Sequence, residues 1–246
     1  MTKQLEDLPT SEVDQVHLQL YQALVGALLW LAMRTRPDIM FCVNFLCRFL
    51  KCATKTHYNL ARGRPLRYLK ATMRMGLVFQ PGQGDWKLTS SADADFAGDN
   101  IHSRSMAGHF SKLGEFGTIS AHCFLERKVA TSTGQAETHA LLSLIKEVVW
   151  LRHLLYDLGH PQLAPTATHT DNRGVLLQST KCINHTRSKH FRVAQAYIRS
   201  KAKDLTILVT DVVSKFNPSD LFTKPLHWPL FQRHRHEVMG PQGFHQ

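Results

Sequence analysis

The most regular pattern in the chain runs through residues 131–159, where apolar side chains recur at steps of three and four. This spacing places them on one face of an α-helix, and Gly159 is a typical residue for the end of such a helix. A helix with one apolar face needs a second layer of structure to bury that face, which constrains the fold on either side of it. The apolar stripe consists of Leu141, Leu144, Val148, Leu151 and Leu155.

Glu137 lies on the same stripe, four residues before Leu141. A carboxylate near the start of a helix is stabilised by the helix dipole, and an acid with only this role would face the solvent. Glu137 faces the same side as the core residues, where a carboxylate is costly unless it is paired or bound to a metal ion. The pattern therefore predicts a buried, functional carboxylate at the start of this helix.

The segments around the long helix favour an α/β fold with one mixed sheet. With 43% apolar and 20% charged residues, the 246-residue chain can bury a core in one large domain or two small ones. Alternating patterns at hairpin spacing precede the helix, and shorter elements follow it. The expected order is strands 86–93, 105–114 and 117–126, the long helix, strand 165–171, helices 173–179 and 186–204, strand 205–213, and a last helix from 217–226.

A different pattern fills the N-terminal part, where helices are expected at 18–33 and 39–50. The basic segment 57–73 contains Gly63 and Pro65, so its helix is expected to begin near Pro65 or to kink there.

The polar Pro/Gly stretch at 80–85 is the expected domain boundary. The residues after Pro229 show no periodicity. We therefore expect a helical, basic domain over 1–80, an α/β domain over 84–226 and a polar basic tail over 227–246.

The charge balance indicates a polyanionic partner, because the chain has 30 Lys and Arg and only 19 Asp and Glu, a net charge of +11. Nucleic acid is the first candidate and an anionic membrane surface the second. Ten of the basic residues lie between positions 34 and 75, with Asp38 as the one acid. This excess favours a phosphate-facing surface over a merely solvated one. The candidate nucleic-acid-binding residues are Arg62, Arg64, Arg67, Lys70, Arg187 and Lys189.

The five cysteines are odd in number and form no CxxC pair, so we expect reduced thiols and no zinc site. The N-terminal residues lack the pattern of a signal peptide. The longest apolar run, residues 23–33, is too short to span ~30 Å of hydrocarbon as a helix. We therefore expect an intracellular protein, cytoplasmic or nuclear, with no membrane partner.

Three further acids lie at the ends of expected elements. Asp93 closes the first strand, Asp171 follows a strand at the start of a helix, and Asp220 precedes the last helix. Each has a simpler alternative role as a turn residue or helix cap. Together with Glu137 they form a set that would hold two Mg²⁺ ions, which prefer oxygen ligands. Two such ions ~3.5–4 Å apart stabilise the attacking water and the leaving oxygen of a phosphodiester.

Several stretches of the chain occur in a characteristic order: "YQALVGALLWLAMRTRPDI", "LRYLKAT", "ADADFAGD", "WLRHLLYDLG", "TDN", "HTRSKHF" and "NPSDLFTKPL". In this order, from about Leu18 to Leu226, they resemble the C-terminal part of copia-type retrotransposon polyproteins. In that family the end of the reverse transcriptase is followed by a ribonuclease H domain. Each stretch alone is a weak signal, whereas the ordered set is specific.

The resemblance implies a ribonuclease H-like mixed sheet flanked by helices, preceded by a small, mainly helical segment similar to the thumb or connection of the polymerase. It implies cleavage of the RNA strand of RNA–DNA hybrids with two Mg²⁺ or Mn²⁺ ions, and the remainder of the polyprotein as a further partner. The catalytic and metal-binding acids carry over to Asp93, Glu137, Asp171 and Asp220. Asp95 and Asp99 are expected to have a peripheral or turn role.

The chain also departs from the family pattern. The polymerase motif Tyr-x-Asp-Asp has no counterpart, so DNA synthesis by this chain is not expected. Gln135 replaces an acid, Thr138 an aromatic residue and Ala121 a tryptophan. These departures leave a second interpretation open, a decayed fragment that binds nucleic acid without cutting it.

Overall fold

The computed structural model describes residues 15–80, 86–99, 102–180 and 189–241. The chain divides into two compact units, Met1–Leu77 and Val78–Gln246. The division lies a few residues before the expected boundary at 80–85.

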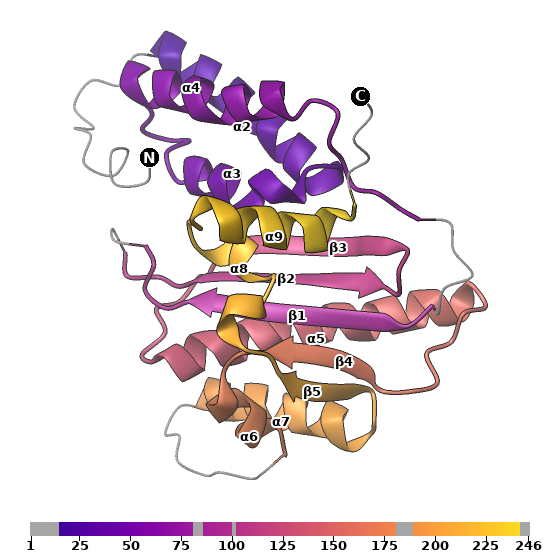
Figure 1. Ribbon diagram of the computed structural model, residues 1–246. Coiled ribbons are helices and arrows are strands. Elements are labelled where there is room, and N and C mark those ends of the chain that lie inside the picture. Colours follow the sequence, from indigo (N-terminus) through magenta and orange to yellow (C-terminus); the bar gives the residue numbers. More distant parts are fainter. Residues whose placement is uncertain (1–14, 81–85, 100–101, 181–188, 242–246) are drawn as a thin grey trace. The chain divides into compact units, whose positions relative to one another are not determined.

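The first unit is helical, as expected, and its helices are labelled in Figure 1. Tyr21 on the first helix is fully buried and its hydroxyl donates to the carbonyl of Leu46 on another helix, 2.8 Å away. The elements are α2 (Gln15–Arg34), the short 3-10 helix η1 (Pro37–Ile39), α3 (Met40–Cys47) and α4 (Lys55–Ala71).

Helix α4 begins at Lys55 and continues through Pro65, so the expected late start near Pro65 is wrong. Its start is fixed by a capping box in which the Thr54 and His57 side chains bond to each other's backbone amides. Pro65 removes one helical hydrogen bond, at a cost of roughly 3 kcal/mol relative to alanine. Ala61 and Pro65 are buried, and the packing of this helix face outweighs the unfavourable helix propensity of proline.

Arg36 is one of the ten basic residues assigned to a phosphate-facing surface, and this assignment is wrong. Its side chain is buried, and two guanidinium nitrogens donate to the Asp38 carboxylate at 2.9 and 2.8 Å. A third donor bonds the carbonyl of Thr72 at 2.9 Å. Arg36 therefore holds the helical unit together.

Helix α2 has 20 residues and is long and apolar enough to cross a membrane. Helix α2 therefore extends beyond both ends of the apolar run at residues 23–33. Length and composition are weak indications, since the core helix of a soluble protein meets the same test. The helix buries Tyr21, Val25, Leu28 and Ala32 along one face, and its other residues are partly or fully exposed.

The second unit is built on one five-stranded sheet with the order β3-β2-β1-β4-β5. β1 pairs antiparallel with β2, and β2 with β3, whereas β4 and β5 run parallel to β1. The expected mixed sheet is confirmed. The strands are β1 (Leu88–Asp95), β2 (Met106–Leu113), β3 (Gly117–Leu125), β4 (Thr166–Thr170) and β5 (Ile207–Asp211).

The long helix forms as predicted, as α5 (Thr133–Asp157). Ser132 caps its start by accepting a hydrogen bond from the amide of Gln135. The chain leaves the helix at Gly159, whose φ of +82° favours glycine. The whole predicted apolar stripe is buried and packs on β1 and β2.

Helices lie on both faces of the sheet, with α5 behind it and α8 and α9 in front in Figure 1. The expected last helix is short, and the expected polar tail instead contains α9, which buries Val238 and Met239. Thr118 on β3 anchors α9 by donating to the carbonyl of Val238 at 2.6 Å. The remaining elements are α6 (Arg173–Thr180), α7 (Lys189–Lys203), η2 (Ser214–Phe216), α8 (Asp220–Thr223) and α9 (Trp228–Met239).

Four of the five cysteines lie in the part of the chain that the structure describes, and all four are free thiols. They are Cys42, Cys47, Cys52 and Cys123, whereas Cys182 lies outside the described residues.

Candidate active site

Three of the predicted acids meet at one edge of the sheet. Asp93 lies near the end of β1, Asp171 follows β4, and Glu137 lies in the first turns of α5. One carboxylate oxygen from each lies within 4.8 Å of the others. The parallel strands β1 and β4 end at the same edge, and this arrangement brings their carboxyl ends together. Asp93 and Glu137 are buried, and Asp171 is half-buried.

The fourth predicted acid, Asp220, joins this group through a lysine. The Lys224 ammonium lies 2.9 Å from Oδ1 of Asp220 and 3.6 Å from Oδ2 of Asp93. The Thr223 hydroxyl donates a hydrogen bond to the same Asp93 oxygen. The acidic cluster defined here comprises Asp93, Glu137, Asp171 and Asp220, with Lys224 between two of its members.

Sequence reasoning missed Thr223 and Lys224, although both stand in the stretch "NPSDLFTKPL". They follow Asp220 by three and four residues, the spacing that places side chains on one face of a helical turn. That spacing is the signal that could have found them.

Burial raises the pKa of three acids in the cluster, Asp93, Glu137 and Asp220. It raises the pKa of Glu137 to about 9, and the carboxylates of Asp93 and Asp171 add to the rise. Burial and then the Asp93 charge raise the pKa of Asp220 to about 7. The pKa of Asp93 is also raised by burial, although Lys224 opposes the change. Burial lowers the pKa of Lys224, but the negative charges of its acidic neighbours, Asp93 most of all, raise it by more. The pKa of Lys224 is therefore raised overall.

The donor set fits a divalent cation. Carboxylate oxygens are the ligands that Mg²⁺ and Mn²⁺ prefer, and three of them converge here. Burial is the largest cause of the raised pKa of Glu137, the carboxylates of Asp93 and Asp171 add to it, and Lys224 offsets only part of the rise. A cation at this position would favour the charged form of each acid.

Two other acids of "ADADFAGD" follow Asp93, Asp95 as the last residue of β1 and Asp99 after the turn that ends the strand. The carbonyl of Asp95 accepts from the amide of Gly98 at 3.3 Å, and the carboxylate of Asp95 lies against Gly98. Asp99 is buried and lies 3.2 Å from the His102 ring. Neither residue belongs to the group of three converging carboxylates.

Two residues that depart from the family pattern, Gln135 and Thr138, form hydrogen bonds at the start of α5. The Gln135 side chain accepts hydrogen bonds from the amide and hydroxyl of Thr131, both at 2.8 Å. The Thr138 hydroxyl donates to the carbonyl of Gly134 at 2.6 Å. The first turn of α5 therefore remains intact around Glu137.

The predicted nucleic-acid-binding residues are divided between the two units. The basic surface of α4, defined as Arg62, Arg64, Arg67 and Lys70, is exposed in the first unit. Lys189 is exposed at the start of α7 in the second unit, and Arg187 lies outside the described residues.

The solved structures similar to this chain include ribonucleases H. One is RNase H1 from Halobacterium salinarum, 16% identical with a TM-score of 0.41, which covers 56% of this chain and 94% of its own. Another is LC11-RNase H1 in complex with an RNA/DNA hybrid, 11% identical with a TM-score of 0.42, which covers 56% of this chain and 94% of its own.

No protein-family model matches the chain. The effector named "Secreted RxLR effector protein 161" from Plasmopara viticola is 38% identical over 131 residues, 53% of this chain and 90% of that protein.

Other relatives cover most of the chain. The Pol polyprotein of transposon TNT 1-94 from Nicotiana tabacum is 33% identical over 204 residues, 83% of this chain and 15% of that protein. The Pol polyprotein of transposon RE1 from Arabidopsis thaliana is 32% identical over 212 residues, 86% of this chain and 14% of that protein. The chain thus spans about 15% of the length of these relatives. Its second unit has the expected mixed sheet flanked by helices, and over most of its length the chain is homologous to the retrovirus-related Pol polyproteins of copia-like transposons.

Proposed function

We propose that the second unit is a metal-dependent ribonuclease H that cuts the RNA strand of RNA–DNA hybrids. The observation that carries this proposal is the convergence of Asp93, Glu137 and Asp171 within 4.8 Å from three separate elements. Buried acids that share a site without enough positive charge are costly, and a functional metal site accounts for them. Membership of the Pol family supports nucleic acid as the substrate.

The acidic cluster would hold two Mg²⁺ or Mn²⁺ ions, with Asp93, Glu137, Asp171 and Asp220 as ligands. When bound, two such ions supply an activated water and stabilise the leaving oxygen of a phosphodiester. Thr223 holds the Asp93 carboxylate in position through its hydroxyl. Lys224 keeps a positive charge beside Asp93 and Asp220, where the phosphate of the substrate adds further negative charge.

In this proposal the basic surface of α4 and the basic residues Arg187 and Lys189 bind the hybrid. The chain has no polymerase motif, so the proposed activity is cleavage alone, inside the cell, alongside the rest of the polyprotein. The direct test is cleavage of a labelled RNA–DNA hybrid with Mg²⁺ or Mn²⁺, with single-stranded RNA and an EDTA reaction as controls. An inert protein that still binds the hybrid would instead support the decayed fragment.

Magnesium should stabilise the folded protein and remove a pH dependence at the acidic cluster. Without metal, folded Glu137 keeps its proton up to about pH 9 although its usual pKa is near 4.5. The folded state then binds more protons than the unfolded state, so stability falls as pH rises through this window. Saturation to 100 times the Kd should add about 2.7 kcal/mol, or roughly 5–10 °C in Tm. Calorimetry from pH 5 to 9, in EDTA and in Mg²⁺, measures both effects.

Glu137→Gln provides the control for this experiment. Between pH 8 and 9 Asp220 is largely ionised, since its pKa is about 7, whereas Glu137, with its pKa of about 9, still contributes to the slope. The variant should lose the slope in this interval and most of the gain from Mg²⁺. If Mg²⁺ leaves the Tm of the parent protein unchanged at every pH, the proposed metal site is contradicted.

Neutralising the basic surface of α4 should weaken binding of the hybrid and flatten its salt dependence. Removal of one lysine or arginine that binds phosphate lowers the log–log slope by about 0.7–0.9, so removal of four corresponds to about 3 units. Fluorescence anisotropy with Arg62, Arg64, Arg67 and Lys70 all changed to Gln measures this slope. The matched control exchanges Arg for Lys and Lys for Arg at the same positions, which keeps the charge and should keep the slope. Equal slopes for the Gln variant and the parent would show that α4 does not meet phosphate.

A further inference from the structure

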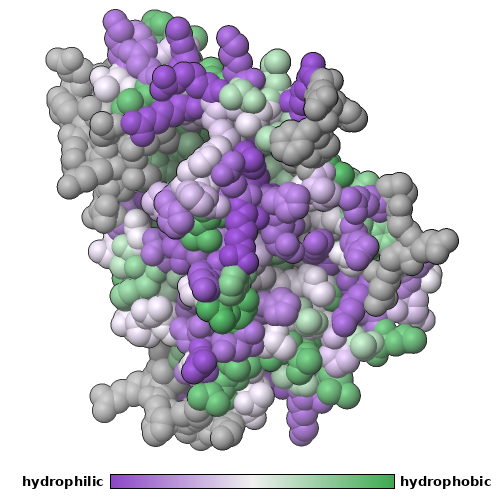
Figure 2. All heavy atoms as spheres, in the orientation of Figure 1, coloured by the Kyte–Doolittle hydropathy of each residue, from purple (hydrophilic) through white to green (hydrophobic). Residues whose placement is uncertain are grey.

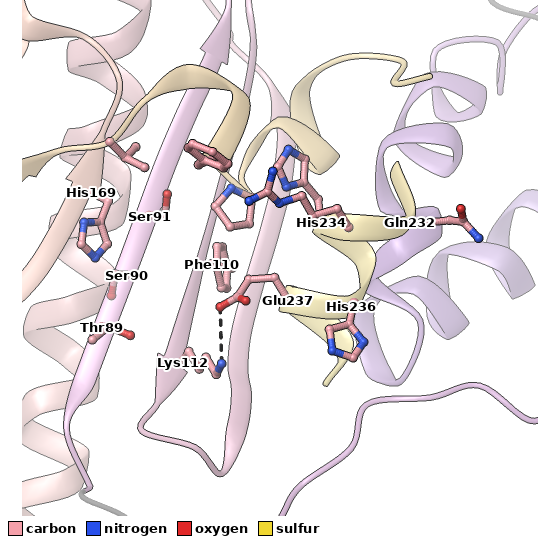
Figure 3. A pocket seen from close by; sticks show the side chains of 14 residues that line it. Thr89, Ser90, Ser91, Phe110, Lys112, His169, Gln232, His234, His236 and Glu237 are labelled. Atoms are coloured by element: carbon pink, nitrogen blue, oxygen red, sulfur yellow. Dashed lines mark hydrogen bonds and ion pairs between the residues drawn. The ribbon is translucent and has the colours of Figure 1, made fainter. Parts of the chain in front are cut away.

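A cavity separate from the acidic cluster lies along β1 in the second unit, on the face that α8 and α9 cover. Its volume is about 790 Å³, within the range of ~300–1,000 Å³ typical of small-ligand sites. Residues of β1, β2, β4, the segment after β5 and α9 line it. Figure 3 shows residues of the strands on one side and residues of α9 on the other. None of the four clustered acids lines this cavity.

The charged groups of the cavity favour an anion. Glu237 is the one acid that lines it, and its carboxylate lies 3.4 Å from the Lys112 ammonium, the dashed line in Figure 3. This pairing leaves the positive charge of Arg233 without an opposing acid among the lining residues. Arg233 is exposed, and its guanidinium carbon lies 4.1 Å from the centre of the Phe216 ring. Figure 2 shows that hydrophilic side chains gather over α9 on this face.

A buried imidazole in the cavity wall has unused hydrogen-bonding capacity. His234 is 1% exposed, and its Nε2 atom has no hydrogen-bond partner among the described residues. Buried polar atoms are nearly always paired, so an unpaired one in a cavity wall can form a hydrogen bond with a ligand or a water molecule in the cavity. His234 therefore adds a polar contact that the protein itself does not satisfy.

The same cavity also has apolar lining residues. Phe110, Phe216, Val212 and Pro218 give it an apolar wall, and Phe216 is 40% exposed. Aromatic and guanidinium planes bind nucleobases by stacking, and a guanidinium also binds phosphate oxygens in a bidentate manner. Arg233 over Phe216 offers both kinds of contact at one place.

We propose that this cavity binds a nucleotide unit, an aromatic base that carries a phosphate. Thr89 and Ser91 line the cavity, and they lie on the same side of β1 as Asp93. At ~3.3 Å per residue these two positions are roughly 7–13 Å from Asp93 along the strand. The nucleotide unit has two sources, a free mononucleotide or the single-stranded end of a nucleic acid.

Calorimetric titration of the full chain with adenosine monophosphate, adenosine and inorganic phosphate tests the proposal. Working in EDTA at pH 7 keeps metal-bridged phosphate away from the acidic cluster, so the result does not depend on the proposed cleavage. Adenosine monophosphate should bind at least about tenfold more tightly than either fragment, because only it uses both the apolar wall and the cation. Arg233→Ala should weaken this binding about tenfold or more, the effect of one charge-assisted contact.

Arg235→Ala is the matched control, because it removes the same charge from the same helix. Arg235 lies over Trp228 and Phe231 and does not line the cavity, so its removal should change affinity less than about twofold. Equal weakening by the two variants, equal binding of phosphate and adenosine monophosphate, or no binding at all would overturn the proposal. Displacement of the mononucleotide by a short single-stranded oligonucleotide, dependent on Arg233, would assign the site to a strand end. Binding of the mononucleotide without such displacement would assign it to the free nucleotide.

Discussion

Asp93→Asn should abolish hybrid cleavage, with a fall of roughly a thousandfold or more, the scale of loss when a residue acting in a catalytic unit is removed. Asp93 lies at the centre of the acidic cluster, close to Glu137 and Asp171 on one side and to Lys224 on the other. The amide has the size of the carboxylate but lacks the charge that a divalent cation needs. Binding of the hybrid should remain or become slightly tighter, because a negative charge near phosphate is removed. Single-turnover cleavage and anisotropy measure the two effects separately.

Asp95→Asn is the control for this variant, since it makes the same chemical change two residues along the same strand. Asp95 lies over the turn at Gly98, outside the three converging carboxylates, so most of the parent activity should remain. If Asp95→Asn removes cleavage and Asp93→Asn does not, the assignment of this stretch is wrong by two residues.

Gly108→Ala should impair both folding and cleavage, although Gly108 carries no functional group. Gly108 pairs with Asp93 across β1 and β2. A Cβ atom at this position would lie 2.4 Å from Cβ of Phe222 and 3.1 Å from Cγ2 of Thr223. The added methyl must push α8 away from the sheet, an overpacking cost of typically about 1–3 kcal/mol. The shift moves Thr223 and Asp220 relative to Asp93, so cleavage should fall even where the protein is folded.

Gly134→Ala is the matched control in the same unit. Nothing lies within 4 Å of a Cβ atom at Gly134, which is part of α5, and alanine favours the helix by about 1 kcal/mol. This variant should be at least as stable and as active as the parent. Chemical denaturation and the cleavage assay at a temperature where both variants are folded provide the comparison. A Gly108→Ala protein with parental stability and activity would show that α8 can shift without consequence.

The parts of the fold that the sequence predicts well are those with strong local signals. α5 carries five apolar residues at helical spacing and a glycine at its end, so its bounds are predicted within two residues. The position of Glu137 on that stripe also predicts its burial, because a helix face is buried as a whole. Asp93 and Asp171 follow from the rule that strand ends of an α/β sheet meet.

The parts that the sequence does not predict depend on distant contacts. α9 has no apolar repeat, because His234 occupies one of its buried positions, and Thr118 of β3 helps to hold it. A count of charged residues does not reveal that Arg36 and Asp38 form a buried pair. Lys224 enters the acidic cluster because α8 lies close to β2, and that approach depends on the missing side chain of Gly108.

The spread of the acidic cluster along the chain has a genetic consequence. The cluster and the adjacent Lys224 together extend from Asp93 to Lys224, and the residues from α8 onward lie after every strand of the sheet. A premature stop or frameshift anywhere between Asp93 and Asp220 removes Asp220, Thr223 and Lys224 together. Among copies of such an element, those whose reading frame stays open past Lys224 are therefore the ones that retain every residue of the cluster.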